Sequence, residues 1–180
     1  SPSRNPKRKL QYSWELMHAD GALVGINTAL PNGLAAEAIE AGEITPLEGY
    51  ESLRREVKYG QNSRVDILLS QAGRPDCYVE IKNVHLMRQP GLAEFPDSVT
   101  KRGAKHLVEL GDMVAAGHRA VMFYLVQRTD CDRFAIAGDI DPTYAEELQR
   151  AMARGVEAIC YDCDIETTGI QVRKPLTLEL

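Results

Sequence analysis

Hydrophobic and polar positions alternate near the start of the chain, and this alternation predicts two paired β-strands. Residues 10–17 carry hydrophobic side chains at every second position, which places them on one face of a strand. Asp20-Gly21 is typical of a tight turn, and residues 23–27 supply the returning strand. The chain is therefore expected to open with a β-hairpin.

Later segments have the periodicity of strands and of helices in turn. Asn32 is predicted to cap the first helix, and Asp141-Pro142 to start the last one. The strands are expected at residues 65–69, 77–84, 120–126, 156–165 and 170–173, the helices at 32–42, 99–116 and 142–154, a loop or frayed strand at 54–63, and a long loop at 85–96.

The order of these elements predicts the fold class. Strands joined first by hairpins and later by helices indicate an α/β fold, with a mixed β-sheet flanked by helices. Residues 120–126 carry no charge, which is typical of a strand buried on both faces. In the strand at 65–69, Val65, Ile67 and Leu69 are expected to share a face.

Composition narrows the class of protein. The 180 residues are 44% hydrophobic and 26% charged, as in one globular domain. No apolar run approaches the roughly 18 residues that span a bilayer, and the first residues lack a signal-peptide pattern. We therefore expect a cytoplasmic protein without membrane contact. Cys160 and Cys163 lie three apart in a predicted strand and face opposite sides, so a structural role is favoured over zinc binding.

The net charge of −5 excludes a polycation, so any contact with nucleic acid must be local. A basic arm at the N-terminus has two interpretations: it contacts phosphate, or it is a solvated, disordered segment. Its cations are Arg4, Lys7, Arg8 and Lys9.

Two carboxylates and a lysine form the main candidate site. A hairpin centred on Gly73 places Asp66 directly opposite Glu80, with Cβ atoms about 5 Å apart, and Lys82 shares the face of Glu80. Paired carboxylates repel unless a divalent cation lies between them, and oxygen ligands suit Mg²⁺ or Mn²⁺. Lys82 would stabilise developing negative charge or hold a water. The alternative is an ordinary solvent-facing strand with a Glu-Lys pair.

Two further groups of residues extend this candidate site. Glu37 lies at the edge of the apolar stripe of its helix, where it is either a third metal ligand or a surface residue. The start of the helix at 99–116 is rich in basic residues, although the helix dipole disfavours cations there. Either this start binds phosphate or it serves solubility. The residues are Lys101, Arg102, Lys105 and His106.

Asp66 followed by Glu80-x-Lys82 resembles the PD-(D/E)xK nuclease core, with Val65-Asp66 in place of Pro-Asp. The surrounding motifs resemble the sugar fermentation stimulation protein A family over nearly the whole chain. These motifs are Gly25-Ile26-Asn27-Thr28-Ala29-Leu30-Pro31-Asn32, Ser63-Arg64-Val65-Asp66, Val79-Glu80-Ile81-Lys82-Asn83-Val84, Phe95-Pro96-Asp97, Thr100-Lys101-Arg102-Gly103-Ala104-Lys105-His106-Leu107 and Val126-Gln127-Arg128.

The resemblance implies an OB-like barrel followed by a nuclease-like α/β domain, non-specific DNA binding, and a regulatory link to maltose metabolism. Residues 1–28 would be a basic arm and a hairpin remnant at the junction with a mostly absent OB-like domain, and residues 29–180 the nuclease-like domain. It also implies that Asp66, Glu80 and the Ile81 carbonyl ligate the metal, that Lys82 is catalytic, and that Glu37 is the acid on the helix.

Two functions remain open from the sequence. The first is a DNA-binding protein with a Mg²⁺- or Mn²⁺-dependent phosphodiesterase (nuclease) site. The second is a non-catalytic, DNA-binding transcriptional regulator of sugar (maltose) metabolism. A sugar-metabolic enzyme is disfavoured, because the sequence contains no phosphate loop, dinucleotide fingerprint or cofactor-lysine motif.

Overall fold

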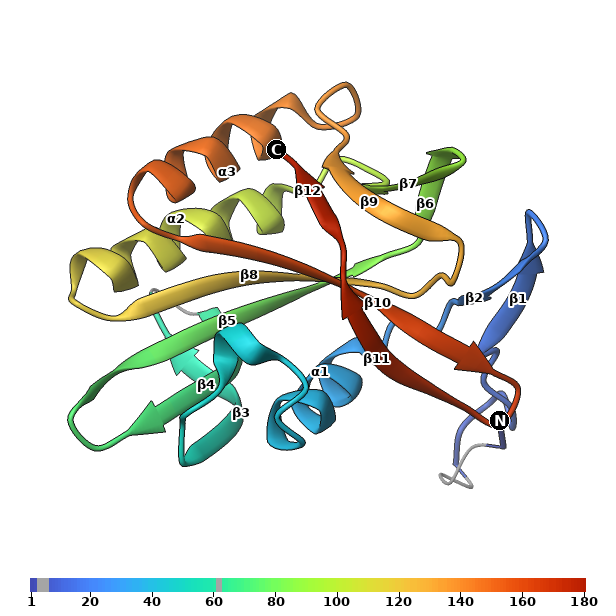
Figure 1. Cartoon of the computed structure of the whole chain (residues 1–180), viewed down its shortest axis with the longest axis horizontal. Helices are drawn as coiled ribbons and strands as arrows, with labels where there is room; N and C mark the ends of the chain where they lie inside the picture. The colour runs from blue at the N-terminus through green and yellow to red at the C-terminus, as the bar shows by residue number, and fades with distance from the viewer. Residues whose placement is uncertain (3–6, 61–62) are drawn as a thin grey trace.

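A six-stranded mixed β-sheet forms the centre of the fold (Figure 1). The computed structural model describes residues 1–2, 7–60 and 63–180. In order across the sheet, the strands are β11 (Gly169–Pro175), β10 (Glu157–Glu166), β8 (Arg119–Val126), β5 (Arg74–Val84), β4 (Ser63–Gln71) and β3 (Ser52–Tyr59). β5 and β10 run parallel to β8, and the other neighbours are antiparallel. The predicted mixed sheet is confirmed.

In the described part of the chain, three α-helices cover the two faces of this sheet. α1 (Pro31–Glu40) packs on one face, and α2 (Lys101–Ala115) and α3 (Pro142–Ala153) lie side by side on the other (Figure 1). A short 3-10 helix, η1 (Thr45–Leu47), follows α1. Proline occupies the first position of both α1 and α3, where the missing N–H costs nothing and the fixed φ favours the helix.

Two smaller sheets complete the structure. The hairpin of β1 (Leu16–Ala19) and β2 (Ala22–Gly25) turns at Asp20-Gly21, as predicted, with both turn residues at positive φ. A four-stranded sheet packs beside α3 on the upper side in Figure 1. In order, its strands are β12 (Thr177–Glu179), β9 (Cys131–Ile136), β7 (Gly91–Phe95) and β6 (Leu86–Gln89).

The central sheet separates two hydrophobic cores. Along β8, Met122 and Tyr124 pack towards α2 and α3, whereas Phe123 and Leu125 pack towards α1. All of Ala120–Val126 is buried, which confirms the prediction from its lack of charge. Cys160 and Cys163 are buried, reduced and in opposite cores, so the predicted structural role fits their placement.

Several sequence-based expectations about elements were wrong. The first strand begins at Leu16 rather than Leu10, and the side chains of Tyr12 and Trp14 are exposed. Of the two expectations for residues 54–63, a loop or a frayed strand, the strand holds as far as Tyr59, where β3 ends. The expected loop at 85–96 contains β6 and β7, and β9 and β12 were not predicted. These short strands carry charged residues, so hydrophobic and polar residues do not alternate clearly along them. Glu94, for example, is buried and forms an ion pair with Arg88.

The starts of α2 and α3 are joined through one buried carboxylate. Asp141 Oδ1 accepts a hydrogen bond from the Tyr144 N–H (3.0 Å), as predicted for the cap of α3. Its Oδ2 accepts one from the Thr100 N–H (2.7 Å), immediately before α2. Asp141 therefore fixes where the basic end of α2 lies.

Replacing Asp141 with alanine is expected to lower the free energy of unfolding by about 1–2 kcal/mol, since the helix cap is lost. Urea unfolding followed by circular dichroism measures this change. The exposed Asp164 of β10 is the matched control: its replacement should stay within about 0.5 kcal/mol of wild type. Equal effects at the two positions would contradict a capping role for Asp141.

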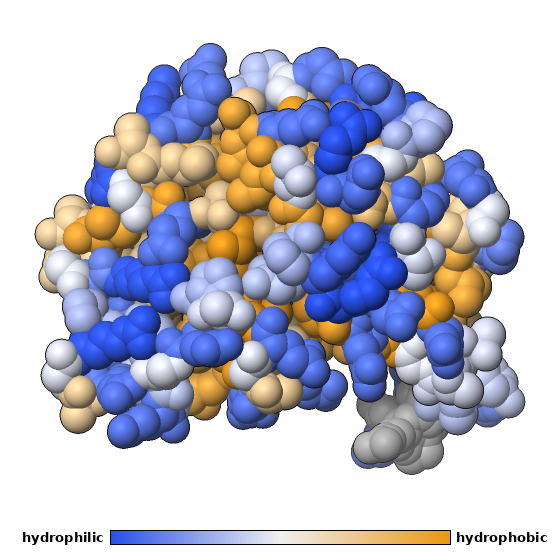
Figure 2. Space-filling model, in the orientation of Figure 1, coloured by the Kyte–Doolittle hydropathy of each residue, from blue (hydrophilic) through white to orange (hydrophobic). Residues whose placement is uncertain are grey.

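The surface is mostly hydrophilic on the face shown in Figure 2. Hydrophobic residues show through where α3 meets β12, and Ile136, Leu148, Met152 and Leu180 line a groove of about 360 Å³ there. Among the described residues, no helix is long and apolar enough to cross a membrane.

Candidate active site

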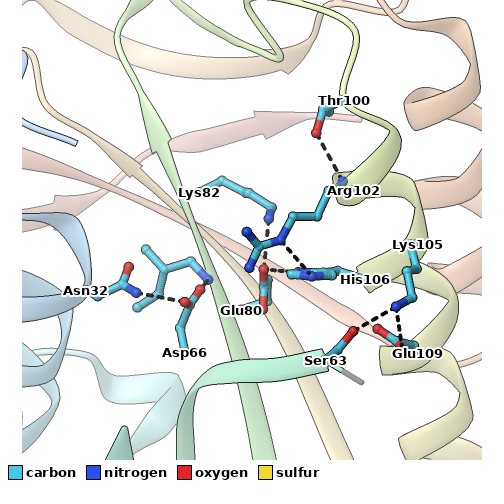
Figure 3. A network of polar contacts seen from close by, with 12 residues as sticks. Asn32, Ser63, Asp66, Glu80, Lys82, Thr100, Arg102, Lys105, His106 and Glu109 are labelled. Carbon is cyan, nitrogen blue, oxygen red and sulfur yellow. Dashed lines mark hydrogen bonds and ion pairs between the residues drawn. The ribbon is translucent and has the colours of Figure 1, made fainter. Parts of the chain in front are cut away.

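The ladder between β4 and β5 ends beside the acidic residues. The pairs from Ile67–Val79 to Leu69–Cys77 have the register predicted around Gly73, and the register shifts before Gln71–Arg74. The predicted direct pair of Asp66 with Glu80 is not part of the ladder. Both strands continue beyond Ile67–Val79, but no further pairing joins them. We call the opening between them, flanked by Asp66, Glu80 and Lys82, the fork. Figure 3 shows these side chains from close by.

At the fork, the side chain of Asp66 accepts a hydrogen bond from the β5 backbone, in the place where a backbone carbonyl of β4 would accept it in a regular ladder. Its Oδ2 accepts a hydrogen bond from the Ile81 N–H (2.7 Å), and its Oδ1 accepts one from Asn32 Nδ2 (2.7 Å) (Figure 3). Asn32 lies inside α1, whose first residue is Pro31, so the prediction that Asn32 caps this helix was wrong. Its side chain instead holds Asp66 from the α1 side of the sheet.

The backbone is distorted where Asp66 lies. The β3–β4 pairing passes from Arg55–Ile67 to Val57–Val65 without a pair at Glu56, which has a positive φ of 55°. As a result Val65 packs in the core next to α2, whereas Ile67 packs in the core next to α1. The expectation that these two residues share a face was wrong, because the distortion interrupts the alternation.

Glu80 is nearly inaccessible, with 3% of its surface exposed. Its Oε1 accepts a hydrogen bond from Lys82 Nζ (2.9 Å) and also bonds His106 Nδ1 (Figure 3). Its Oε2 is buried and has no hydrogen-bond partner within the described part of the chain. A buried carboxylate oxygen without a hydrogen-bond partner destabilises the folded protein. A cation that binds this oxygen would remove that cost.

The electrostatics of the two carboxyl groups differ. Burial raises the pKa of Glu80, but the His106 hydrogen bond and the Lys82 charge outweigh it, so the net pKa lies below the usual value for Glu. Burial and the charge of Glu80 raise the pKa of Asp66, in spite of the Ile81 N–H. A cation bound between them would relieve this repulsion.

The available ligands are oxygens, which suit a hard cation. In a strand, the N–H and C=O of one residue point to the same side. Because the Ile81 N–H bonds Asp66, its carbonyl also faces the fork. Within the described residues, no three His, Cys, Asp or Glu side chains cluster as a metal site. Two carboxylates and a carbonyl, completed by water, are a donor set that fits Mg²⁺.

Glu37 does not lie at the fork. It is exposed on α1 and lines a groove against Ile170 and Val172 of β11. The residue of α1 that reaches Asp66 is Asn32, five residues earlier in the chain. Wheel geometry placed Glu37 at the edge of the apolar stripe, but it could not show which edge faces the fork.

The basic residues at the start of α2 divide into two groups. Lys101 and Arg102 are exposed, and Lys105 lies between Ser63 Oγ (3.2 Å) and Glu109 Oε1 (3.5 Å). His106 is 4% exposed and points at Glu80 (Figure 3). The first three lie on the surface at the start of α2, whereas His106 is buried against Glu80.

The N-terminal arm is only partly described. Arg4 lies outside the described residues. Lys7 and Lys9 are exposed, and Arg8 donates a hydrogen bond to Ser13 Oγ (2.7 Å). The Arg8 contact therefore lies within the N-terminal segment itself.

The sequence analysis did not identify two exposed cations near Ser63 or the burial of His106 against Glu80. Lys58 and Arg64 are exposed, directly opposed in the β3–β4 ladder, and line a pocket of about 360 Å³ with Tyr59 and Ser63. Their alignment depends on the pairing of β3, which was not firmly predicted. His106 adjoins Leu107 in the buried stripe of α2, and this position could have indicated an inward-facing side chain.

Comparisons with known proteins identify the family and the fold of the chain. Residues 29–169 match the family model described as "Sugar fermentation stimulation protein RE domain". A sugar fermentation stimulation protein homolog of Paramagnetospirillum magneticum is 60% identical over 180 residues, which are 100% of this chain and 76% of that protein. The homolog of Rhodospirillum centenum is 62% identical over 178 residues, covering 99% and 76%.

A solved structure also matches the whole chain. The structure of Pyrococcus furiosus SfsA in complex with Ca²⁺ has a TM-score of 0.89 and 30% sequence identity, and the match covers 100% of this chain and 76% of that chain. The family model covers well over half of the chain, and the relatives exceed half identity over nearly all of it. The chain therefore belongs to the sugar fermentation stimulation protein family.

Proposed function

We propose that this chain binds DNA and hydrolyses its phosphodiester bonds at the fork with Mg²⁺ or Mn²⁺. The observation that carries the proposal is the unpartnered, buried Oε2 of Glu80, next to the second carboxylate of Asp66 and the ammonium of Lys82. The Ca²⁺ in the Pyrococcus furiosus complex belongs to that protein. It supports a hard divalent cation here, since Ca²⁺ and Mg²⁺ both prefer oxygen ligands.

The cation would be held by Asp66, Glu80 Oε2 and the Ile81 carbonyl. When bound, it would polarise the phosphate and lower the pKa of a bound water. The chain's own residues complete the chemistry. The Lys82 side chain is 15% exposed, and its ammonium can stabilise the negative charge that develops on the phosphate or orient the attacking water. Asn32 and the Ile81 N–H keep the Asp66 carboxylate in place.

Exposed cations around the fork would bind the DNA backbone. Lys101, Arg102 and Lys105 lie at the N-terminus of α2, where the helix dipole also favours phosphate. Lys58 and Arg64 would contact phosphates along the β3–β4 hairpin. Such contacts do not read the base sequence, so the binding is proposed to be non-specific.

In this proposal the nuclease-like domain spans residues 29–180. Residues 1–28 form the arm and junction hairpin, whose Lys7, Arg8 and Lys9 would add phosphate contacts. Because the substrate is DNA, the proposed place of action is the cytoplasm.

The direct test incubates the purified chain with linear, nicked and single-stranded DNA, with Mg²⁺ or Mn²⁺ and with EDTA. We expect cleavage of at least one DNA with metal, none with EDTA, and recovery when excess Mg²⁺ is added. Isothermal titration should detect one Mn²⁺ site without DNA. Absence of both cleavage and Mn²⁺ binding would overturn the proposal.

A second candidate is a non-catalytic DNA-binding regulator of sugar (maltose) metabolism that uses the nuclease scaffold only to hold DNA. It is favoured by the donor set, because Asp66 and Glu80 are the two acidic side chains that the described part of the chain brings to the fork. This regulator would bind DNA with a steep salt dependence and no metal requirement. Salt-dependent binding that is insensitive to Mn²⁺, together with intact DNA, would select it.

A further inference from the structure

Glu80 is supported by a chain of two hydrogen bonds that ends at the protein surface. Arg102 Nε donates to His106 Nε2 (3.3 Å), and His106 Nδ1 bonds Glu80 Oε1 (Figure 3). Arg102 and His106 are four residues apart on α2, so they share a face of the helix. Arg102 is exposed, whereas His106 and Glu80 are 4% and 3% exposed.

The partners of His106 determine where its proton lies. Arginine only donates hydrogen bonds, so Nε2 must accept from Arg102 and carries no proton. Glu80 Oε1 also takes a hydrogen bond from the Lys82 ammonium, which only donates, so Oε1 is an acceptor here. Nδ1 must therefore carry the proton and donate it to Oε1. Both neighbours independently require the same neutral tautomer, which is the less favoured one for histidine free in water.

The same contacts determine which oxygen of Glu80 stays available. His106 and Lys82 both donate to Oε1. Oε2 is left without a hydrogen-bond partner among the described residues. If the carboxylate turned, the His106 N–H and the Lys82 ammonium would lose their acceptor.

We propose that His106 and Arg102 are positioning residues: Arg102 fixes the Nδ1–H tautomer of His106, and His106 in turn fixes Glu80 so that Oε2 ligates the divalent cation. This inference rests on the proposed metal site. Neither residue touches the cation. Residues that orient a metal ligand in this way typically contribute 10–100-fold to metal affinity.

Nuclear magnetic resonance tests the tautomer without metal or DNA. The chain has only four histidines, so long-range proton–nitrogen correlations can resolve each ring. We expect His106 to show a protonated Nδ1 and an unprotonated Nε2 at neutral pH, and Arg102→Ala to convert it to a mixture of tautomers. The exposed His18 should be unaffected. A proton on Nε2 of His106 in the wild type would overturn the inference, whether or not the protein binds metal.

Mn²⁺ titration without DNA tests the consequence for the metal. His106→Leu is expected to weaken Mn²⁺ binding about 10–100-fold, and His106→Asn, whose amide can still donate to Oε1, to restore most of it. Arg102→Ala should also weaken binding, although loss of a nearby cation by itself would strengthen it. Lys101→Ala is the charge-matched control, because it removes an exposed neighbouring cation without contacting His106, and should not weaken binding.

The outcomes separate this inference from the proposed function. If the wild type binds no Mn²⁺, both fail. If the wild type binds Mn²⁺ and Arg102→Ala and folded His106→Leu bind it equally well, the positioning role fails and the metal site stands. Arg102 is exposed, so its variant provides the measurement even if His106→Leu does not fold.

Discussion

Replacing Glu80 with glutamine is expected to abolish metal-dependent DNA cleavage while leaving the affinity for DNA unchanged. Glutamine keeps the shape of the side chain and an oxygen that can accept from His106 and Lys82. In place of Oε2 it presents an N–H₂ group, which donates hydrogen bonds and cannot ligate a cation. Mn²⁺ affinity should fall by more than about 100-fold, because removing a residue that only orients a metal ligand already lowers metal affinity by about 10–100-fold.

Isothermal titration with Mn²⁺ and a gel assay of cleavage measure the two effects, and fluorescence anisotropy in EDTA measures DNA affinity. Asp66→Asn should behave in the same way. Glu37→Gln is the matched control, because Glu37 is exposed beside β11 and away from the fork. If Glu80→Gln kept turnover and Mn²⁺ binding, the fork would not be the metal site.

Replacing Lys82 with methionine is expected to lower the rate of cleavage by about 10²–10³-fold at saturating metal, as when a preorganised charge is removed from a developing anion. Metal binding should persist, because Lys82 contacts Oε1 of Glu80 and not the unpartnered Oε2. Loss of a cation next to both carboxylates should even strengthen Mn²⁺ binding. Opposite effects on rate and affinity distinguish Lys82 from the ligands.

Single-turnover cleavage at several Mn²⁺ concentrations gives the rate and the affinity together. Lys82→Arg keeps the charge and should recover part of the rate. Lys174→Met removes an exposed lysine of β11 and should leave both values unchanged. An unchanged rate in Lys82→Met would assign the lysine a purely structural role as the ion-pair partner of Glu80.

The sequence predicted strong periodic elements well and weak ones poorly. β8, α2 and α3 were predicted because long buried runs or helical stripes dominate their residues. β6, β7, β9 and β12 were missed because they are short and their charged residues are neutralised by partners distant along the chain: Arg88, for example, pairs with Asp139. Such pairing cannot be read from local alternation.

By itself, the sequence determined the family, the mixed sheet and the register that brings Asp66 and Glu80 to neighbouring strands, because hairpin geometry around Gly73 is local. Only the tertiary structure decided how the site is built. In the folded chain, β4 and β5 separate beyond Ile67–Val79. Asn32, rather than Glu37, contacts Asp66 from α1, and His106 is buried against Glu80. Both contacts join segments that are far apart in the chain. These contacts depend on how helices pack across the sheet, and helix periodicity fixes which residues share a face but not what that face meets.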